Sequence, residues 1–331
     1  MIISKTPFRM SFFGGGTDMP DFFNRYGGSV LSTTFDKYCY VLTRHLPAFF
    51  DYSNEVTYSK VERVAAPEDI KHPAVREAMR FLDMRELHVS YDADLPARSG
   101  LGSSSSFMVG MLNAFSALKG KYMSKDQLAR NAIYVERTMC NEAGGWQDQI
   151  AAAYGGLNRI DFADNDFKVR PVIISNERKR RLEDNIMMFF SGQTRIAGDM
   201  EIKKKKDFQT KIMELNEMKR LVDEAEAILT SKSDLNEFGR LLDYTWQLKR
   251  GISHVSTDDI DLMYERAKNA GALGGKVLGA GGGGFIILYV EQEKQENVIK
   301  ALEDKLYVPM KFENTGATIL YFQAEDYEMR K

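Results

Sequence analysis

The sequence predicts a two-domain protein of the α+β class. Its 331 residues exceed the roughly 250–300 at which a single hydrophobic core stops growing. Short runs of strand type dominate the first half, whereas the second half alternates strands with helices. A polar and charged stretch at residues 164–183 lies between them. We therefore expect an N-terminal domain at residues 1–170 and a C-terminal domain at residues 171–331.

The elements of the first half follow from periodicity. Residues 30–34, 38–43 and 87–91 have strand character, and residues 7–13 read as a strand that carries Arg9. Apolar residues recur every three or four positions over residues 103–119, which predicts a helix. A second helix is expected over residues 125–140, with Ser124 as its N-cap and Gln127 three residues later.

The second half predicts the order strand, helices, strand, helix, strand. Residues 186–190 form the first strand, and a long helical region covers about residues 199–250. A shorter helix at residues 258–269 is stopped by Gly271. The strands at 285–290 and 316–322 enclose a helix at 293–305.

Composition excludes several classes of protein. Hydrophobic residues make up 44% of the chain and charged residues 28%, as in ordinary globular proteins. A net charge of −2 argues against a nucleic-acid partner. The two cysteines, Cys39 and Cys140, are too few for a disulfide framework and lack zinc-site spacing. Neither a signal peptide nor a membrane-spanning run is evident, so we expect a soluble cytoplasmic protein with no membrane partner; a homodimer is left open.

The first glycine-rich segment joins an expected strand to a polar turn. Arg9 precedes the three glycines at positions 14–16, and Thr17 and Asp18 follow. Glycine permits positive φ and a close backbone approach to a ligand. Thr17 and Asp18 then suit hydrogen bonds to sugar or polyol hydroxyls. The alternative is a tight turn in which Asp18 caps a helix.

The second segment, residues 95–106, lies between an expected strand and an expected helix. Backbone N–H groups and the helix dipole at such a junction favour phosphate. A serine hydroxyl there can also ligate Mg²⁺. The alternative is a simple serine-capped helix, but four consecutive serines, residues 103–106, exceed what one cap needs.

The third segment, residues 274–284, contains a formal GxGxxG at Gly279, Gly281 and Gly284. Its context is opposite to a dinucleotide fingerprint, because a helix precedes it and a strand follows. A Walker A motif also fails, since Val277 follows Lys276. The HRD and DFG strings of protein kinases do not occur in the sequence.

In order and spacing, the three segments resemble the motifs of the GHMP kinases, which include galactokinase, homoserine kinase and mevalonate kinase. The resemblance implies a ribosomal-protein-S5-domain-2-like N-terminal domain and a ferredoxin-like C-terminal domain, with the active site in the cleft between them. It also implies that ATP binds to residues of the second segment. Those residues are Pro96, Gly100, Leu101, Gly102, Ser103, Ser104 and Ser105.

The resemblance also implies catalytic roles. Asp148, in a Gly-x-x-Asp segment that starts at Gly145, matches the family's catalytic base, and Arg9 would stabilise the transferring phosphoryl group. Glu136, on the preceding helix, would hold Mg²⁺ together with Ser104. A helix-capping role for Asp148 and a surface-helix role for Glu136 are the alternatives.

The acceptor implied by the resemblance is a sugar phosphate. Galactokinases carry Gly-Glu-His-Thr-Asp where this chain has three glycines, Thr17 and Asp18, so more space opens beside the sugar. The segment is similar to that of bacterial heptose kinases, which phosphorylate the anomeric oxygen of D-glycero-D-manno-heptose 7-phosphate. We expect the substrate contacts at Gly15, Gly16, Thr17, Asp18, Arg195, Gly281 and Gly282.

Arg195 is the leading candidate for the 7-phosphate, because arginine suits phosphate geometry, although an exposed arginine without a specific role is an equal alternative. Three other functions stay open: an L-fucokinase or another sugar-1-kinase, an isoprenoid-pathway kinase, and a non-catalytic ligand-binding regulator.

Overall fold

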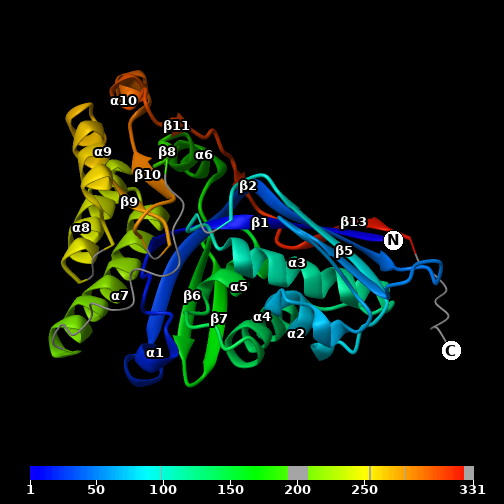
Figure 1. Cartoon of the computed structure of the whole chain (residues 1–331). Helices are drawn as coiled ribbons and strands as arrows, with labels where there is room; N and C mark the ends of the chain where they lie inside the picture. Colours follow the sequence, from blue (N-terminus) through cyan, green and yellow to red (C-terminus); the bar gives the residue numbers. More distant parts are fainter. Residues whose placement is uncertain (98, 193–207, 253–254, 280, 324–331) are drawn as a thin grey trace.

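Two β-sheets organise the chain (Figure 1). The computed structural model describes residues 1–97, 99–192, 208–252, 255–279 and 281–323. Within these residues the first sheet has nine strands and the second has four. Each sheet carries its own helices, and the first lies next to the N-terminus while the second forms the other end of the molecule (Figure 1).

The first sheet is built around one long strand. The regions predicted as two strands, 30–34 and 38–43, are a single strand β2 (Gly28–His45). β2 pairs antiparallel with β1 (Ile2–Phe13) and also pairs with β5 (Leu87–Ala93) and β6 (Asn158–Ala163) at opposite ends. Three shorter strands extend the sheet, and they are β3 (Asn54–Thr57), β4 (Val61–Val64) and β7 (Asp166–Pro171).

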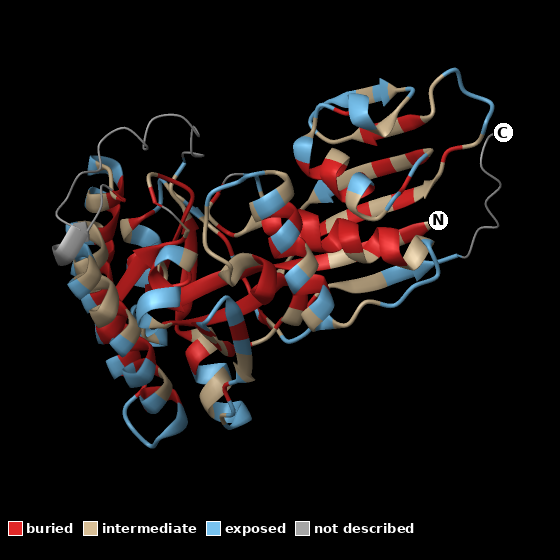
Figure 2. Cartoon of the chain, turned by 90° about the horizontal axis from the view of Figure 1, so that it is seen from below, coloured by how far each residue is buried: buried red, intermediate tan, exposed pale blue. Residues whose placement is uncertain are grey.

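Helices cover one face of this sheet (Figure 1). The predicted helix at 103–119 is α3 (Ser103–Leu118), which packs on β1 and β2 and is buried along most of its length (Figure 2). The expected cap of α4 (Lys125–Ile133) is confirmed, because Ser124 and Gln127 form a capping box. Beyond α4 the chain widens into a π-helical stretch, Tyr134–Met139. The other helices of this part are α1 (Pro20–Tyr26), α2 (Pro73–Phe81) and α5 (Gln147–Tyr154).

The second sheet has the ferredoxin-like arrangement. Its strands are β8 (Ile186–Phe190), β9 (Gly274–Val277), β10 (Phe285–Tyr289) and β11 (Leu306–Tyr307), in the order β11-β8-β10-β9. Helices separate β8 from β9 and β10 from β11, which gives the β-α-β-β-α-β pattern. These helices are α7 (Phe208–Thr230), α8 (Asn236–Ile252), α9 (Asp258–Asn269) and α10 (Gln295–Ala301). Strand β9 was not predicted, because its glycines read as part of a loop. A further helix, α6 (Asn176–Asp184), joins the two sheets and falls in the stretch expected to be a boundary.

The structure corrects the predicted domain division at its C-terminal end. The prediction assigned all of residues 171–331 to the second domain. Instead, β13 (Thr318–Phe322) pairs with β1, and β12 (Phe312–Glu313) pairs with β2 of the first sheet. Edge pairing explains the return, because β1 offers backbone hydrogen-bonding groups on the side opposite β2. The first domain is therefore discontinuous in sequence.

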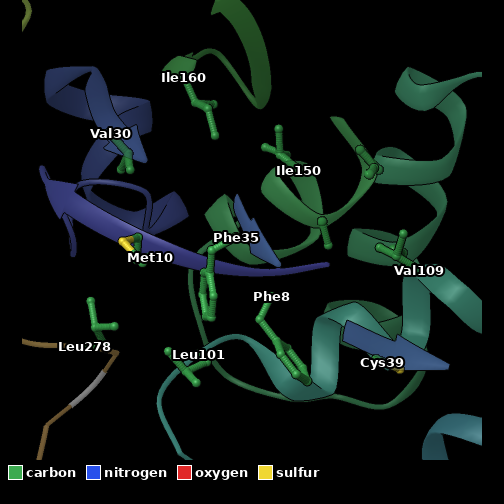
Figure 3. Close-up of a cluster of buried hydrophobic side chains, with 14 of the residues drawn as sticks. Phe8, Met10, Val30, Phe35, Cys39, Leu101, Val109, Ile150, Ile160 and Leu278 are labelled. Atoms are coloured by element: carbon green, nitrogen blue, oxygen red, sulfur yellow. The ribbon is translucent and has the colours of Figure 1, made fainter. Parts of the chain in front are cut away.

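One hydrophobic core spans both sheets. Phe12 and Phe13 of β1 pack edge-on against Phe238 of α8, with ring centroids 5.3 and 5.0 Å apart. Figure 3 shows Leu101 and Leu278, from the second and third glycine-rich segments, in the same cluster of buried side chains. A smaller core that includes Trp246 lies on the other side of the second sheet. No helix in the described part of the chain is long and apolar enough to span a membrane.

Candidate active site

Arg9 and Asp148 form a bidentate ion pair between β1 of the first sheet and α5. Arg9 Nε and Nη2 donate to the two carboxylate oxygens of Asp148, each at 2.8 Å. Such paired bonds fix both side chains in one plane. The Arg9 side chain is 5% exposed and that of Asp148 is 23% exposed, so the carboxylate can still be reached. The capping alternative for Asp148 does not describe this geometry, because the side chain lies in the first turn of α5 and pairs with Arg9.

The second glycine-rich segment touches this ion pair directly. Arg9 Nη1 donates to the carbonyl of Gly100 at 2.7 Å, and the Arg9 backbone N–H donates to Leu101 at 3.3 Å. Gly102 adopts a left-handed conformation (φ 74°) as the N-cap of α3. A side-chain carbon at Gly102 would lie 3.3 Å from Asp148 Oδ2. The start of α3 is therefore adjacent to the Asp148 carboxylate.

The serines at the start of α3 divide into two kinds. Ser103 and Ser104 are reachable from outside, and the N–H groups of a first helical turn have no acceptor within the helix. Ser105 and Ser106 are buried, and the Ser106 hydroxyl donates to the carbonyl of Pro7. Pro96 is exposed at the entrance of the segment, whereas Leu101 belongs to the core. The residues expected to bind ATP thus divide into accessible ones, such as Ser103 and Ser104, and buried ones, such as Leu101 and Ser105.

Glu136 lies beside these serines, so the surface-helix alternative is wrong. Its carboxylate is 1% exposed and accepts hydrogen bonds from Ser104 Oγ at 3.2 Å and Ser105 Oγ at 2.8 Å. Gln149 Nε2 donates to it as well. Burial raises the pKa of Glu136, while Arg137 and these hydrogen bonds oppose the rise. The π-helical stretch carries this side chain, in keeping with the frequent use of π-bulges at functional sites.

Ser104 and Glu136 provide a hydroxyl and a carboxylate oxygen, the hard donors that Mg²⁺ prefers. No cluster of three or more His, Cys, Asp or Glu that could hold a metal occurs in the described ranges. A magnesium ion here would therefore take its remaining ligands from nucleotide phosphates and water, as is usual for this ion.

The third glycine-rich segment closes against the second. A side-chain carbon at Gly279 would lie 2.6 Å from Gly100 Cα, and one at Gly284 would lie 2.2 Å from the carbonyl of Ser99. The two segments can approach this closely only because residues 279 and 284 are glycines, which have no side-chain carbon. Gly281 and Gly282, expected to contact substrate, pack against Val255, where Gly282 N–H donates to the Val255 carbonyl at 2.8 Å.

Thr17 differs from its expected role as a substrate contact. Its side chain is fully buried, and its hydroxyl lies 2.8 and 2.9 Å from the carbonyls of Gly14 and Ser29. The Ser29 backbone N–H also donates to it at 3.1 Å. The hydroxyl therefore has its hydrogen bonds inside the protein, where it ties the loop to β2.

Asp18 is also turned inward. It is 2% exposed, and its oxygens accept from the backbone N–H groups of Gly16 at 3.0 Å and Gln147 at 3.2 Å. Burial and the nearby Asp148 raise the pKa of Asp18. Asp18 therefore caps a helix, but the helix is α5 and not α1, which follows it directly in the chain. The N-cap residue of α1 is Met19. Gly145 makes room for it, since a side-chain carbon there would lie 1.8 Å from Asp18 Oδ2.

Two lysines near the pair were not identified from the sequence. Lys249 of α8 donates to the Gly279 carbonyl at 2.7 Å, and burial together with the Arg9 charge lowers the pKa of Lys249 to about 8. Lys276 of β9 is 2% exposed and donates to the carbonyls of Ser11 and Phe12 at 2.8 and 3.0 Å. Burial, Lys249 and Arg9 lower the pKa of Lys276. The sequence does not distinguish Lys249 from other lysines, because lysine is common in the last turn of a helix.

Arg195, the expected phosphate contact, lies outside the described residues. Gly15 and Gly16 lie in the turn between Arg9 and Asp18 and are partly exposed. The structure thus brings together Arg9, Asp148, Ser104 and Glu136 from three separate parts of the chain.

Comparison with known proteins identifies the family of the chain. Residues 70–156 match the family model described as GHMP kinases N terminal domain, and residues 224–308 match GHMP kinases C terminal. A D-glycero-alpha-D-manno-heptose 7-phosphate kinase of Campylobacter jejuni subsp. jejuni is 32% identical over 317 residues, covering 91% of this chain and 93% of that protein. A bifunctional fucokinase/GDP-fucose pyrophosphorylase of Arabidopsis thaliana is 26% identical over 95% of this chain and 32% of its own length.

A solved structure shares the fold along the whole chain. A D-glycero-D-manno-heptose 1-phosphate kinase from Bacteriodes thetaiotaomicron superposes with a TM-score of 0.80 at 26% identity. The match covers 98% of this chain and 100% of that one.

Proposed function

The chain belongs to the GHMP kinases, a family of ATP-dependent phosphotransferases, and from this premise we propose that it phosphorylates the anomeric oxygen of D-glycero-D-manno-heptose 7-phosphate. The product would be the 1,7-bisphosphate. The observation that carries the chemistry is the paired Arg9–Asp148 contact against the start of α3. The choice of sugar rests on the 32% identity to a heptose 7-phosphate kinase over 91% of the chain.

Each residue has a physical part in the proposed transfer. Asp148 accepts the proton of the O1 hydroxyl as O1 bonds to the γ-phosphorus and the bond to ADP breaks. Arg9 orients Asp148 and, with its remaining donors, faces the charge that develops on the phosphoryl oxygens. The N–H groups of the first turn of α3 bind nucleotide phosphates.

Magnesium is part of the proposal. Ser104 and Glu136 would hold the ion, which supplies positive charge to the phosphate oxygens. Ser105 and Gln149 hydrogen-bond to the Glu136 carboxylate and fix its direction. We place the reaction in the cytosol, and a homodimer stays a proposal from the sequence.

The phosphate that the acceptor already carries needs a cation of its own, in addition to the groups that bind the phosphates of ATP. Lys249 fits, because an ammonium group has three donors and one of them is directed to Gly279. Its positive charge is weakly compensated, since Asp18 attracts it while Arg9 repels it. We propose Lys249 as a contact to the acceptor's phosphate, and Arg195 remains a proposal from the sequence.

A substrate panel tests the proposed function. ADP release is measured with ATP and magnesium in the presence of heptose 7-phosphate, free heptose, fucose, galactose, mannose or mevalonate. We expect a clear preference for the 7-phosphorylated sugar. Equal turnover of the free sugars would contradict the heptose phosphate assignment, and binding of sugars without ATP turnover would point to a regulator.

L-fucokinase activity is the second candidate function. The observation that favours it is the 26% identity to a fucokinase-containing protein over 95% of this chain. A preference for fucose over heptose 7-phosphate in the same panel would select it.

A further inference from the structure

The three consecutive glycines of the first segment are not equivalent. Gly14 has a φ of +81°, and a side-chain carbon there would lie 1.9 Å from the Ser29 carbonyl. Gly16 has a φ of +99°, which disfavours any other residue. Gly15 lies outside the left-handed region, and the nearest atoms to its hypothetical side-chain carbon are 3.9 and 4.0 Å away. Folding therefore explains Gly14 and Gly16 but gives no reason for a glycine at position 15.

The two atoms nearest to that empty position are polar. They are the hydroxyl oxygen of Ser11 at 3.9 Å and the carboxamide nitrogen of Gln147 at 4.0 Å. Ser11 Oγ and Gln147 Oε1 are both buried, and neither has a hydrogen-bond partner in the described part of the chain. Buried polar atoms without partners are rare in native proteins, because each costs its lost hydration. The Ser11 hydroxyl and the Gln147 carboxamide, whose nitrogen is the atom nearest to Gly15 and whose oxygen has no partner, therefore indicate a place for hydroxyl groups of a ligand.

This position is next to the catalytic pair. Ser11 follows Arg9 by two residues on β1, so both side chains lie on the same face of the strand. Gln147 directly precedes Asp148 in the first turn of α5. Lys276 holds the Ser11 carbonyl at 2.8 Å, which fixes this part of β1 from the second sheet. A ligand with one hydroxyl at Asp148 can therefore place others at Ser11 and Gln147.

We propose that Ser11, Gly15 and Gln147 form a subsite that binds hydroxyl groups of the acceptor sugar, with Gly15 left bare to make room for it. The inference rests on the proposed sugar kinase activity and names the residues that select the acceptor. The Ser11 hydroxyl and the Gln147 carboxamide each supply a donor and an acceptor to the sugar. Gly15 has no side chain, so it contributes neither charge nor hydrogen bonds to the subsite. Its contribution is the volume that it leaves for the acceptor.

The first test adds one methyl group. Gly15→Ala is expected to raise KM for the sugar at least about tenfold, the scale on which lost contacts of this kind act, and to leave KM for ATP and the melting temperature unchanged. Gly251→Ala is the matched control, because its nearest neighbour is also distant, 3.8 Å away at Glu214. An unchanged KM for the sugar in Gly15→Ala would overturn the proposal.

The second test removes the polar groups one at a time. Ser11→Ala and Gln147→Leu are each expected to raise KM for the sugar about two- to tenfold, as for loss of a neutral hydrogen bond. A fall in kcat with unchanged KM would instead assign Gln147 to positioning of Asp148 and would contradict its place in the subsite. Unchanged kinetics in both variants would remove the subsite as a whole.

Failure of this inference can be told apart from failure of the proposed function. The wild-type protein is first given the substrate panel, and the variants are then tested with the sugar that it turns over best. If that sugar is not heptose 7-phosphate, the heptose assignment fails while the Gly15→Ala comparison stays decisive. If no sugar is turned over, calorimetric titration of the wild type and Gly15→Ala with the same sugars measures the subsite alone, and equal affinities would refute it.

Discussion

Arg9 connects Asp148 to the second glycine-rich segment. Three of its donors are directed to specific acceptors, two to Asp148 and one to the Gly100 carbonyl. A lysine could not reproduce this fork, because its ammonium group acts as a point charge. Lys249 adds a second cation from α8, and burial together with the Arg9 charge lowers the pKa of Lys249 to about 8.

Asp148→Asn removes the proposed base and keeps its shape. Since general base catalysis contributes about 10²–10⁴-fold, we expect kcat to fall by that order. The melting temperature should change little, because the amide still fills the same space. Asp304→Asn, at a half-exposed ion pair with Arg266 that involves no residue of the site, is the control. Wild-type turnover in Asp148→Asn would show that another group takes the proton.

Lys249→Met separates binding of the acceptor's phosphate from binding of the sugar. We expect KM for heptose 7-phosphate to rise while KM for the unphosphorylated sugar stays the same. The folded protein disfavours the charged form of Lys249, as its lowered pKa indicates, so the variant should be at least as stable as the wild type. A similar rise in KM for both sugars would contradict a specific contact to the phosphate.

The pH dependence of acceptor binding follows from the same residue. Below about pH 8 Lys249 is charged, and above it the ammonium group loses its proton. The ionisable groups that face it are Arg9, Lys276 and Asp18, of which Arg9 lowers the pKa of Lys249 and Asp18 raises it. We therefore expect KM for the phosphorylated sugar to increase as pH rises through about 8 in the wild type. Steady-state rates measured from pH 6.5 to about 9.5 give this KM. An equal increase of KM with pH in Lys249→Met would assign the change to another group.

At the scale of elements, α5 is held in place by a distant loop. Asp18 accepts the backbone N–H of Gln147, and its own carbonyl accepts that of Trp146 at 3.2 Å. A carboxylate at the start of a helix accepts a hydrogen bond from an otherwise unpaired N–H group, and its negative charge interacts favourably with the helix dipole. Asp18 therefore acts on Asp148 through the position of the helix.

Gly145→Ala tests this link between loop and helix. The added carbon would lie 1.8 Å from Asp18 Oδ2, so either the loop or the start of α5 must move. We expect both kcat and the melting temperature to fall, in contrast to Gly251→Ala. Wild-type values for both quantities would show that Asp18 does not support α5 as described.

For the whole molecule, the shared core makes the two sheets one cooperative unit. Phe238 of α8 is fully buried between Phe12 and Phe13 of β1. Lys276 adds polar contacts from β9 to the same strand. A domain that shares its core with a neighbour is not expected to unfold by itself.

Phe238→Ala should therefore destabilise the whole chain in one transition. Removing a buried phenylalanine costs about 3–5 kcal/mol, and we expect that loss in the free energy of unfolding. Ile173→Ala is the control, because Ile173 is 83% exposed. Two separate transitions in calorimetry, with only one of them shifted, would contradict a common core.

Much of the site could be predicted because its groups are carried by local patterns. Arg9, Asp148, Glu136 and Ser104 were identified from short motifs, and the structure places them together, although their roles remain predictions. The helices at 103–118 and 258–269 and the strand at 186–190 were predicted closely, since periodicity and caps act over a few residues. Thr17 and Lys249 could not be assigned, because their burial and the carbonyls that they bind are set by how the chain packs.

The sequence by itself determined the α+β class, the three glycine-rich segments and the family, because these depend on local spacing and on the order of motifs. Only the tertiary structure decided that β12 and β13 return to the first sheet and that Asp18 supports α5. Only it separated Gly15, which folding leaves free, from Gly14 and Gly16, which folding requires. The physical reason is that contacts between segments of the chain, and the backbone torsions that go with them, are set by packing, and no local pattern in the sequence specifies them.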